Sequence, residues 1–218
     1  MKDPEAEFFR DILRRAAPDL SCTHTPTLEA LEAASARAIA PCRLIAFSTQ
    51  IIVPGQILRR HAFDAYNFHP GPPDYPGSKP SAFAVYEGAD RFGVTLHRMA
   101  ERVDSGEIVA TRHFAIPPDA VARDVATEAY GCMARLAFDY APVLARAGRP
   151  LPTSGEKWTG VKRRMADYEA LRRIPAGLDG AELDRRFRAC EGIYSPVPAG
   201  RSPAGASPMP TDSSRSPS

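Results

Sequence analysis

The amino-acid sequence predicts an α/β fold in which a mostly parallel β-sheet is flanked by helices. Two short apolar runs, residues 43–47 and 65–68, have the length and composition of strands that are buried on both faces, as in parallel sheets. Stretches with apolar residues at helical spacing alternate with these runs along the chain. The pattern indicates a single domain over residues 1–195 and a low-complexity tail over residues 196–218.

The first 47 residues are expected to form a helix, a strand, a helix and a strand. Apolar residues recur at helical spacing over residues 5–16, and Asp3 and Pro4 supply a helix start. Residues 20–24 favour a short strand. Thr27 begins a second helix with Glu29 in its first turn, and residues 43–47 form the next strand.

The middle of the chain places its least regular segment directly after a strand. Pro54 opens a helical turn, and the strand at residues 65–68 runs into a loop at residues 69–77 that is rich in proline and glycine. A helix is expected over residues 81–87. Alternating residues then predict two strands, 93–99 and 107–114, joined as in a hairpin by residues 100–106. The tip of this connection carries Asp104.

The C-terminal part begins with the longest predicted helix, which Gly148 ends. Its apolar positions are three or four residues apart: Val125, Ala129, Met133, Leu136, Tyr140 and Leu144. Residues 149–180 are polar and interrupted by prolines, although Trp158 favours packing on the domain. A last helix is expected over residues 179–189, and the composition beyond Ser195 predicts disorder.

Charge and composition argue against several classes of protein. The chain has 218 residues, and its 28 basic and 26 acidic side chains leave a net charge of +2, which creates no general attraction to nucleic acid or membranes. The four cysteines are scattered and form no zinc-binding pattern, so no metal is expected. No segment approaches the ~20 apolar residues of a membrane span, and we expect a cytoplasmic protein.

Asn67 and His69 are two positions apart at the end of a predicted strand, so both side chains leave the same face of the sheet. Ligands of α/β sheets bind beyond the carboxyl ends of the strands. An amide and an imidazole can both donate hydrogen bonds to a carbonyl oxygen that gains charge as its carbon becomes tetrahedral. A carboxylate such as Asp104 would raise the pKa of the histidine and could accept the proton of an attacking amine, directly or through water.

Four short motifs around these residues follow one another along the chain: Tyr66-Asn67-Phe68-His69-Pro70, Tyr75-Pro76-Gly77, Gly93-Val94-Thr95-Leu96-His97 and Val103-Asp104-Ser105-Gly106-Glu107-Ile108. Their order and the spacing from His69 to Asp104 resemble those of the folate-dependent formyltransferase family. The resemblance covers residues 40–148 well and the flanks weakly. It implies a Rossmann-like fold from which the usual first strand and its acceptor-binding loop are expected to be missing.

The resemblance also implies the roles of the site residues. Asn67 and His69 would polarise a formyl carbonyl, while Asp104 would keep His69 charged and manage the transfer of protons. The formyl donor would be 10-formyltetrahydrofolate. The pterin of this folate would be bound by two segments of the chain: Ile51, Ile52 and Val53 in the first, and Arg102 and Val103 in the second.

The acceptor implied by the resemblance is an amine of a small molecule. The sequence has no room for the RNA-binding C-terminal barrel of methionyl-tRNA formyltransferase, so tRNA is not expected as a partner. The loop after His69 reads Gly71-Pro72-Pro73-Asp74, where many relatives carry Ser-Leu-Leu-Pro. Contacts with the acceptor are therefore expected to differ from theirs.

Other polar and aromatic residues have a simpler structural interpretation. His97 could touch the folate, but a histidine on an alternating strand is more often a structural residue. Trp158 is interpreted as a packing anchor. Nine basic residues between positions 157 and 188 could bind a phosphorylated acceptor, but we favour the solvated faces of helices because acidic residues lie among them.

Three functions stay open at this point. Transfer of a formyl group to a small amine is favoured, and hydrolysis of the same donor, with water in place of the amine, would use the same three side chains. A folate-binding or interaction module without catalysis is the third possibility. The presence of all three of Asn67, His69 and Asp104 argues against it.

Overall fold

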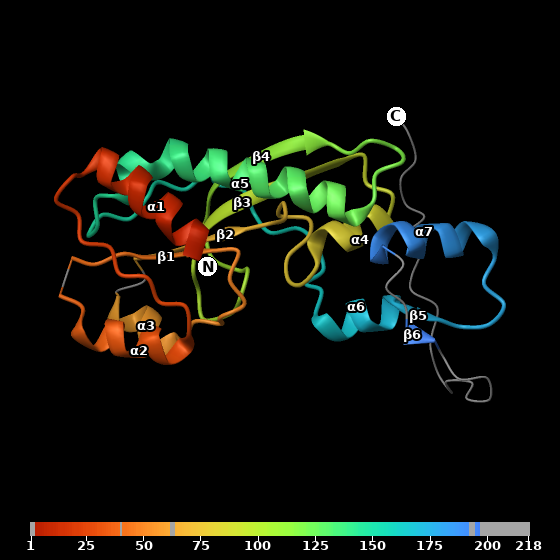
Figure 1. Cartoon of the computed structure of the whole chain (residues 1–218), viewed down its shortest axis with the longest axis horizontal. Coiled ribbons are helices and arrows are strands. Elements are labelled where there is room, and N and C mark those ends of the chain that lie inside the picture. The colour runs from red at the N-terminus through yellow and green to blue at the C-terminus, as the bar shows by residue number, and fades with distance from the viewer. Residues whose placement is uncertain (1–2, 40, 62–63, 192–194, 197–218) are drawn as a thin grey trace.

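A four-stranded mixed β-sheet forms the centre of the protein in the computed structural model, which describes residues 3–39, 41–61, 64–191 and 195–196 (Figure 1). The strands β1 (Leu44–Phe47), β2 (Ala65–His69), β3 (Arg91–Arg98) and β4 (Ile108–Ala115) lie side by side in that order. Strand β1 pairs with β2 in parallel, and the other two pairs are antiparallel.

The α/β class is confirmed, but the expectation of a mostly parallel sheet is wrong for the strands described. Residues 48–64 between β1 and β2 are long enough for the crossover that parallel neighbours need. The connection between β3 and β4 is short, and a short connection can join only antiparallel neighbours. The same chain therefore combines both kinds of pairing.

Helices α1 (Asp3–Ala16) and α5 (Ala122–Leu144) cover one face of the sheet (Figure 1). They bury the aromatic side chains Phe9, Phe47 and Phe68, whose ring centroids lie 5.1–5.6 Å apart. Each buried aromatic side chain of this kind stabilises the fold by about 1.5–3 kcal/mol relative to an exposed one. This face therefore holds the main core, and it leaves the opposite face available for other contacts.

The opposite face is covered in part by helix α3 (Gly55–Arg60), next to α2 (Leu28–Arg37). Leu58 of α3 packs with Ala46, Ala65 and Met99 in a second, small cluster. The expected start of α2 is confirmed, because the Thr27 side chain accepts a hydrogen bond from the third helical residue. The part of this face near α3 is therefore apolar.

A further group of helices, α4 (Pro80–Tyr86), α6 (Met165–Leu171) and α7 (Gly180–Cys190), lies at the right-hand end of the molecule in the view of Figure 1. Helices α4 and α7 pack together with α6 through Phe83, Leu171 and Ala189. The short strands β5 (Arg173–Ile174) and β6 (Ser195–Pro196) pair beside them. Helix α6 and strand β5 fall in the stretch for which the sequence predicted no regular structure.

Two further expectations are corrected or lie outside the structure. Residues 20–24 adopt no strand, because no neighbouring strand pairs with them. The predicted tail, residues 196–218, lies outside the described residues except for Pro196, which belongs to strand β6. Among the helices described, none is long and apolar enough to cross a membrane.

Candidate active site

The end of strand β2 carries Asn67 and His69 on one face of the sheet. Tyr66 and Phe68 point into the core under α1 and α5, and the two polar side chains leave the opposite face, as the alternation predicts. His69 is buried, and its Nε2–H donates a hydrogen bond of 3.0 Å to the Tyr75 carbonyl. The rigid strand thus positions an amide and an imidazole next to each other.

Asp104 reaches the same place from the loop between β3 and β4. Its backbone has φ +50°, in the left-handed region that Asp and Asn tolerate better than most residues. Its Oδ2 lies 3.6 Å from His69 Nδ1 and accepts a 2.9 Å hydrogen bond from the Gly77 N–H. The structure therefore brings together the three residues that the sequence selected, with Asp104 held from a second loop.

His97 is a fourth member of the cluster, and the sequence interpretation underrated it. It pairs across the strands with Asn67, and its Nε2 lies 3.1 Å from the Asn67 amide nitrogen and 3.5 Å from Asp104 Oδ1. Its Nδ1–H donates to the Arg98 carbonyl at 2.8 Å. The alternation in residues 93–99 contained the signal, because His97 shares the face of the site with Thr95 rather than with the core.

Burial, hydrogen bonds and neighbouring charges together set the protonation of this cluster. Burial lowers the pKa of His69, and the Asp104 carboxylate and the Tyr75 carbonyl oppose this effect without cancelling it. For Asp104, burial alone would raise the pKa, but a hydrogen bond with His97, the charges of both histidines and the Gly77 N–H lower it to about 2. The expectation that Asp104 keeps His69 charged is therefore corrected: the favoured state at neutral pH has an ionised Asp104 beside a neutral His69.

Trp158 covers the two histidines. Its ring centroid lies 5.7 Å from that of His69 and 5.0 Å from that of His97, with ring planes at 73° and 87°. Its indole N–H donates a 2.8 Å hydrogen bond to the Gly106 carbonyl. The sequence predicted a packing anchor, and the structure places that anchor against the site itself.

The two segments assigned to a pterin lie on the side of the sheet that α3 covers. Val53 packs against the small cluster around Leu58 and Met99, whereas Ile52 is 69% exposed. The Ile51 N–H donates a hydrogen bond to the side-chain oxygen of Thr49. Glu101, next to Arg102, forms an ion pair with Arg59 of α3.

Val103 is the last of the five residues predicted to bind a pterin. Its side chain is exposed, and its carbonyl accepts a hydrogen bond from Lys162. Both loops therefore border the same helix, close to where Met99 leaves β3.

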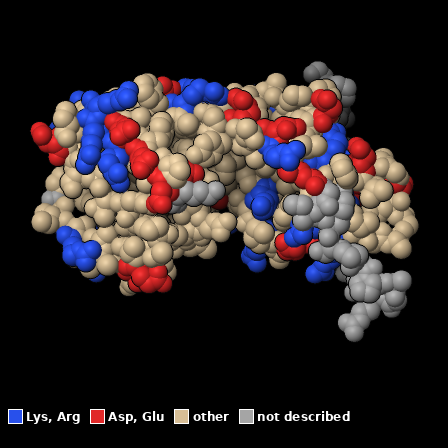
Figure 2. All heavy atoms as spheres, in the orientation of Figure 1, with Lys and Arg blue, Asp and Glu red and all other residues tan. Residues whose placement is uncertain are grey.

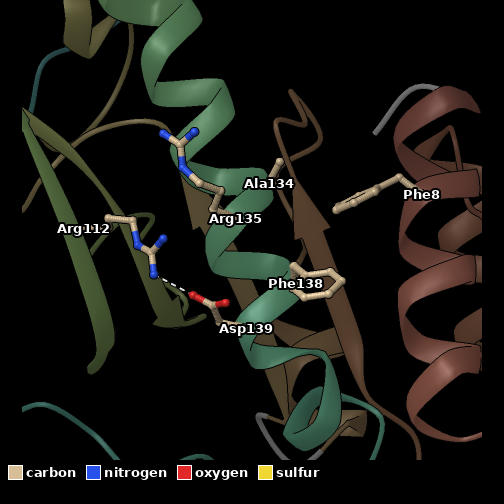
Figure 3. Close-up of a pocket in the computed structure, with 6 residues that line it drawn as sticks. All are labelled: Phe8, Arg112, Ala134, Arg135, Phe138 and Asp139. Atoms are coloured by element: carbon tan, nitrogen blue, oxygen red, sulfur yellow. Dashed lines mark hydrogen bonds and ion pairs between the residues drawn. The ribbon is translucent and has the colours of Figure 1, made fainter.

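A surface hollow on the far side of the sheet is unrelated to these residues (Figure 3). It lies between α1, α5 and β4, and its rim includes the ion pair of Arg112 with Asp139. No predicted site residue lines it. Within the described ranges, no group of three or more His, Cys, Asp or Glu side chains could hold a metal ion.

Four of the nine basic residues between positions 157 and 188 form ion pairs with acidic side chains. The pairs include Arg163 with Glu87, Arg172 with Glu169, and both Arg185 and Arg186 with Glu182. Figure 2 shows basic and acidic side chains interleaved on the visible face, including the region of α4 and α7. This arrangement supports the interpretation as solvated helix faces over that of a phosphate site.

Comparison with known proteins supports one family. Residues 26–130 match the model of the formyl transferase family. A sugar N-formyltransferase from Shewanella has the same fold, with a TM-score of 0.67 at 18% identity over 86% of this chain and 84% of that one. A 4-N formyltransferase from Francisella tularensis gives 0.63 at 17% identity over 83% and 84%.

The formyltransferase PseJ from Anoxybacillus kamchatkensis, solved with a formamido nucleotide sugar and tetrahydrofolate, gives a TM-score of 0.60 at 20% identity over 84% of this chain and 94% of that one. At such identities the structures establish the fold, and the matched family model adds the sequence pattern. The family match over residues 26–130 and the fold shared with these enzymes together support the assignment of the chain to the formyltransferases.

Proposed function

We propose that the protein transfers a formyl group from 10-formyltetrahydrofolate to an amine of a small-molecule acceptor. The observation that carries the proposal is the convergence of Asn67, His69 and Asp104 beyond the end of strand β2, at one buried point. An amide donor, an imidazole donor and an ionised carboxylate are the groups that acyl transfer to an amine requires.

In the proposed reaction the acceptor nitrogen attacks the formyl carbon, and the bond from that carbon to N10 of the folate breaks. The Asn67 amide and the Nε2–H of His69, which now donates to the Tyr75 carbonyl, would donate to the formyl oxygen as it gains charge. The proton that leaves the amine passes through the pair of Asp104 and His69, directly or by water, to N10 of the departing tetrahydrofolate. Atoms and charge balance in this sequence of steps.

The donor is proposed from the solved relatives and from the loops around α3. An N-formyltransferase from Helicobacter canadensis was solved with folinic acid and dTDP-3-aminofucose, and PseJ was solved with tetrahydrofolate. In this chain Ile51, Ile52 and Val53 on one side, and Arg102 and Val103 on the other, are proposed to hold the pterin. These segments border α3 next to the strand that carries His97.

A nucleotide-linked amino sugar is proposed as the first acceptor to test. The relative from Helicobacter was solved with dTDP-3-aminofucose, and PseJ was solved with a nucleotide sugar that carries a formamido group. Transfer RNA is not proposed. We also propose that residues 1–195 act as one catalytic domain, since the described helices at both ends pack into hydrophobic clusters around the sheet.

The test is a direct assay of formyl transfer. Purified protein would be incubated with 10-formyltetrahydrofolate and a panel of nucleotide-linked amino sugars, and tetrahydrofolate and formamide product would both be quantified for wild type and His69→Ala. Product that depends on the amine and on His69 supports the proposal. Tetrahydrofolate and formate released at the same rate without any amine would instead establish a hydrolase, and no turnover of the donor under any condition would refute both.

A further inference from the structure

Residues 154–163 form a strap across the face of the sheet that carries the candidate site. The strap begins at β4, where the Ser154 N–H donates to the Ile108 carbonyl. It ends at the loop after β2, where the N–H groups of Thr159 and Gly160 donate to the Pro73 carbonyl at 3.1 and 3.2 Å. Its backbone therefore connects the start of β4 with the loop that supplies the Tyr75 carbonyl. Two of its side chains, Trp158 and Lys162, donate hydrogen bonds to the Gly106 and Val103 carbonyls of the loop that supplies Asp104.

The backbone of the strap and of the loop after β2 is tightly packed. A Cβ atom on Gly160 would lie 1.6 Å from the Asp74 carbonyl oxygen, and one on Gly71 would lie 2.7 Å from His69 Nε2. His69 is thus confined on the side of Gly71, and Trp158 of the strap contacts its ring from another direction. The rotamer of the histidine is set by its surroundings rather than by the strand alone.

We propose that Trp158 is a positioning residue for the formyl transfer: its ring holds His69 and His97 in their orientations, and its N–H fixes the strap to the loop that carries Asp104. The inference rests on the proposed function for its catalytic consequence. The ordering of the two imidazole rings is inferred independently of that function, from the ring contacts and from the hydrogen bond to Gly106.

Two physical effects of the indole oppose each other at His69. An aromatic ring near an imidazolium stabilises the charged form by about 0.5–2 kcal/mol. Exclusion of water disfavours the charged form, by up to several pKa units for a fully buried group. Burial is the largest influence on the pKa of His69, and the charged or titratable groups that face it are Asp104 and His97. Trp158 is one of the side chains in contact with the buried His69 ring, so we expect its removal to admit water and to raise the His69 pKa.

The test compares Trp158→Ala and Trp158→Phe with wild type and with Thr159→Ala. The control removes the strap's side-chain hydrogen bond to Asp74 and leaves both histidine contacts in place. The variants would be assayed for kcat and for KM of the donor, and the His69 ring would be titrated by NMR. Circular dichroism would confirm folding, and Trp158→Leu would replace the alanine variant if that variant unfolds.

We expect Trp158→Ala to lower kcat by up to about 10²-fold, the scale of a 1 Å misplacement, with a KM for the donor within about threefold of wild type. The His69 pKa should rise as water enters, and Trp158→Phe should lie between Trp158→Ala and wild type. Equal values of kcat and of the His69 pKa in Trp158→Ala and Thr159→Ala would overturn the inference. If wild type shows no formyl transfer, the proposed function fails, whereas the titration still decides whether Trp158 orders the histidines.

Discussion

At the scale of single residues, the candidate site depends on the alternation of side chains along two neighbouring strands. Asn67 and His69 on β2, and Thr95 and His97 on β3, share one face, while their neighbours in sequence fill the core. Thr95 is fully buried and donates a hydrogen bond to the Gly71 carbonyl, which holds the loop after β2 against the sheet. Each of these four polar side chains therefore has a hydrogen-bond partner.

The first prediction concerns the amide donor. Asn67→Ala removes one of the two donors aimed at the developing oxyanion, and loss of one such donor typically costs ~10²–10³ in kcat. We expect a loss of that size with a small change in KM for the donor, measured by steady-state kinetics. Thr111→Ala, on the same face of β4 but bonded to the exposed Glu156, is the matched control and should stay within about threefold of wild type.

The second prediction concerns pH. The pKa of His69 is lowered and that of Asp104 is about 2, so on acidification His69 takes up a proton before Asp104 does. Because the proposed reaction needs a pair that can accept a proton, kcat should be constant above the normal histidine pKa of about 6.5 and should fall as pH drops below it.

Asp104→Asn should shift the midpoint of this fall to lower pH, since the carboxylate is the group that raises the His69 pKa. It should also reduce kcat at every pH. Rates followed from pH 4.5 to 8.5 would test both statements. A fall in wild-type kcat centred above the normal histidine pKa of about 6.5 would contradict the assignment of a neutral His69.

At the scale of elements, the loop between β3 and β4 is the most constrained part of the site. Asp104 adopts a left-handed backbone there, and Gly106 lies so close to the Arg98 carbonyl that a Cβ atom would be only 1.9 Å from its oxygen. The Gly106 carbonyl also receives the Trp158 N–H. The glycine thus allows the loop to turn back over β3 and to present Asp104.

The third prediction follows from this close approach. Gly106→Ala forces the loop away from β3, and overpacking of this kind typically costs 1–3 kcal/mol. We expect a loss of unfolding free energy in that range, measured by urea denaturation, and a larger relative loss of kcat because Asp104 moves with the loop.

Gly180→Ala provides the control, because a Cβ atom at this first residue of α7 meets no atom within 4 Å. Alanine is the better helix former, so the control should be neutral or more stable by up to about 1 kcal/mol. Equal stability of the two variants would contradict the account of the loop.

The helices differ in how well their sequences predict them. Helices α1 and α5 have apolar stripes that match large buried faces, and α2 and α7 begin at the side-chain caps Thr27 and Asp179. Helix α6 has seven residues and a single buried side chain, Leu171, so its sequence carries no apolar stripe. It forms because Leu171 finds Phe83 and Ala189 in the folded protein.

At the scale of the whole molecule, Arg43 ties the start of β1 to the end of α5. Its guanidinium is almost fully buried, forms an ion pair of 2.8 Å with Asp64, and donates to the carbonyls of Val143, Leu144 and Arg149. It also lies over the Tyr66 ring, at 5.2 Å from the centroid. One cation therefore connects segments about a hundred residues apart in sequence.

The fourth prediction is that Arg43→Ala destabilises the fold by about 3–5 kcal/mol, because it leaves the Asp64 carboxylate, whose side chain is only 13% exposed, without its cation and three carbonyls without their donor. Urea denaturation would measure the change. Arg59→Ala removes an ion pair with Glu101 in which both side chains are more than half exposed, and it should cost less than about 1 kcal/mol. A similar cost for the two variants would contradict the role assigned to Arg43.

The sequence by itself determined the α/β class, the order of most helices and strands, and the choice of Asn67, His69 and Asp104. These follow from local properties: periodicity, caps and the position of polar residues at strand ends. The sequence also predicted the hairpin of β3 and β4. The antiparallel pairing of β2 with β3, the place of His97 beside Asn67 and the contact of Trp158 with both histidines were decided only by the tertiary structure.

The protonation of His69 belongs to the second group as well. A nearby carboxylate predicts a raised pKa, but the burial that lowers it comes from residues far apart in the chain. Strand pairing, ring contacts and burial all depend on segments that come together only in the folded protein. The local sequence pattern of one segment does not determine which other segments it will contact.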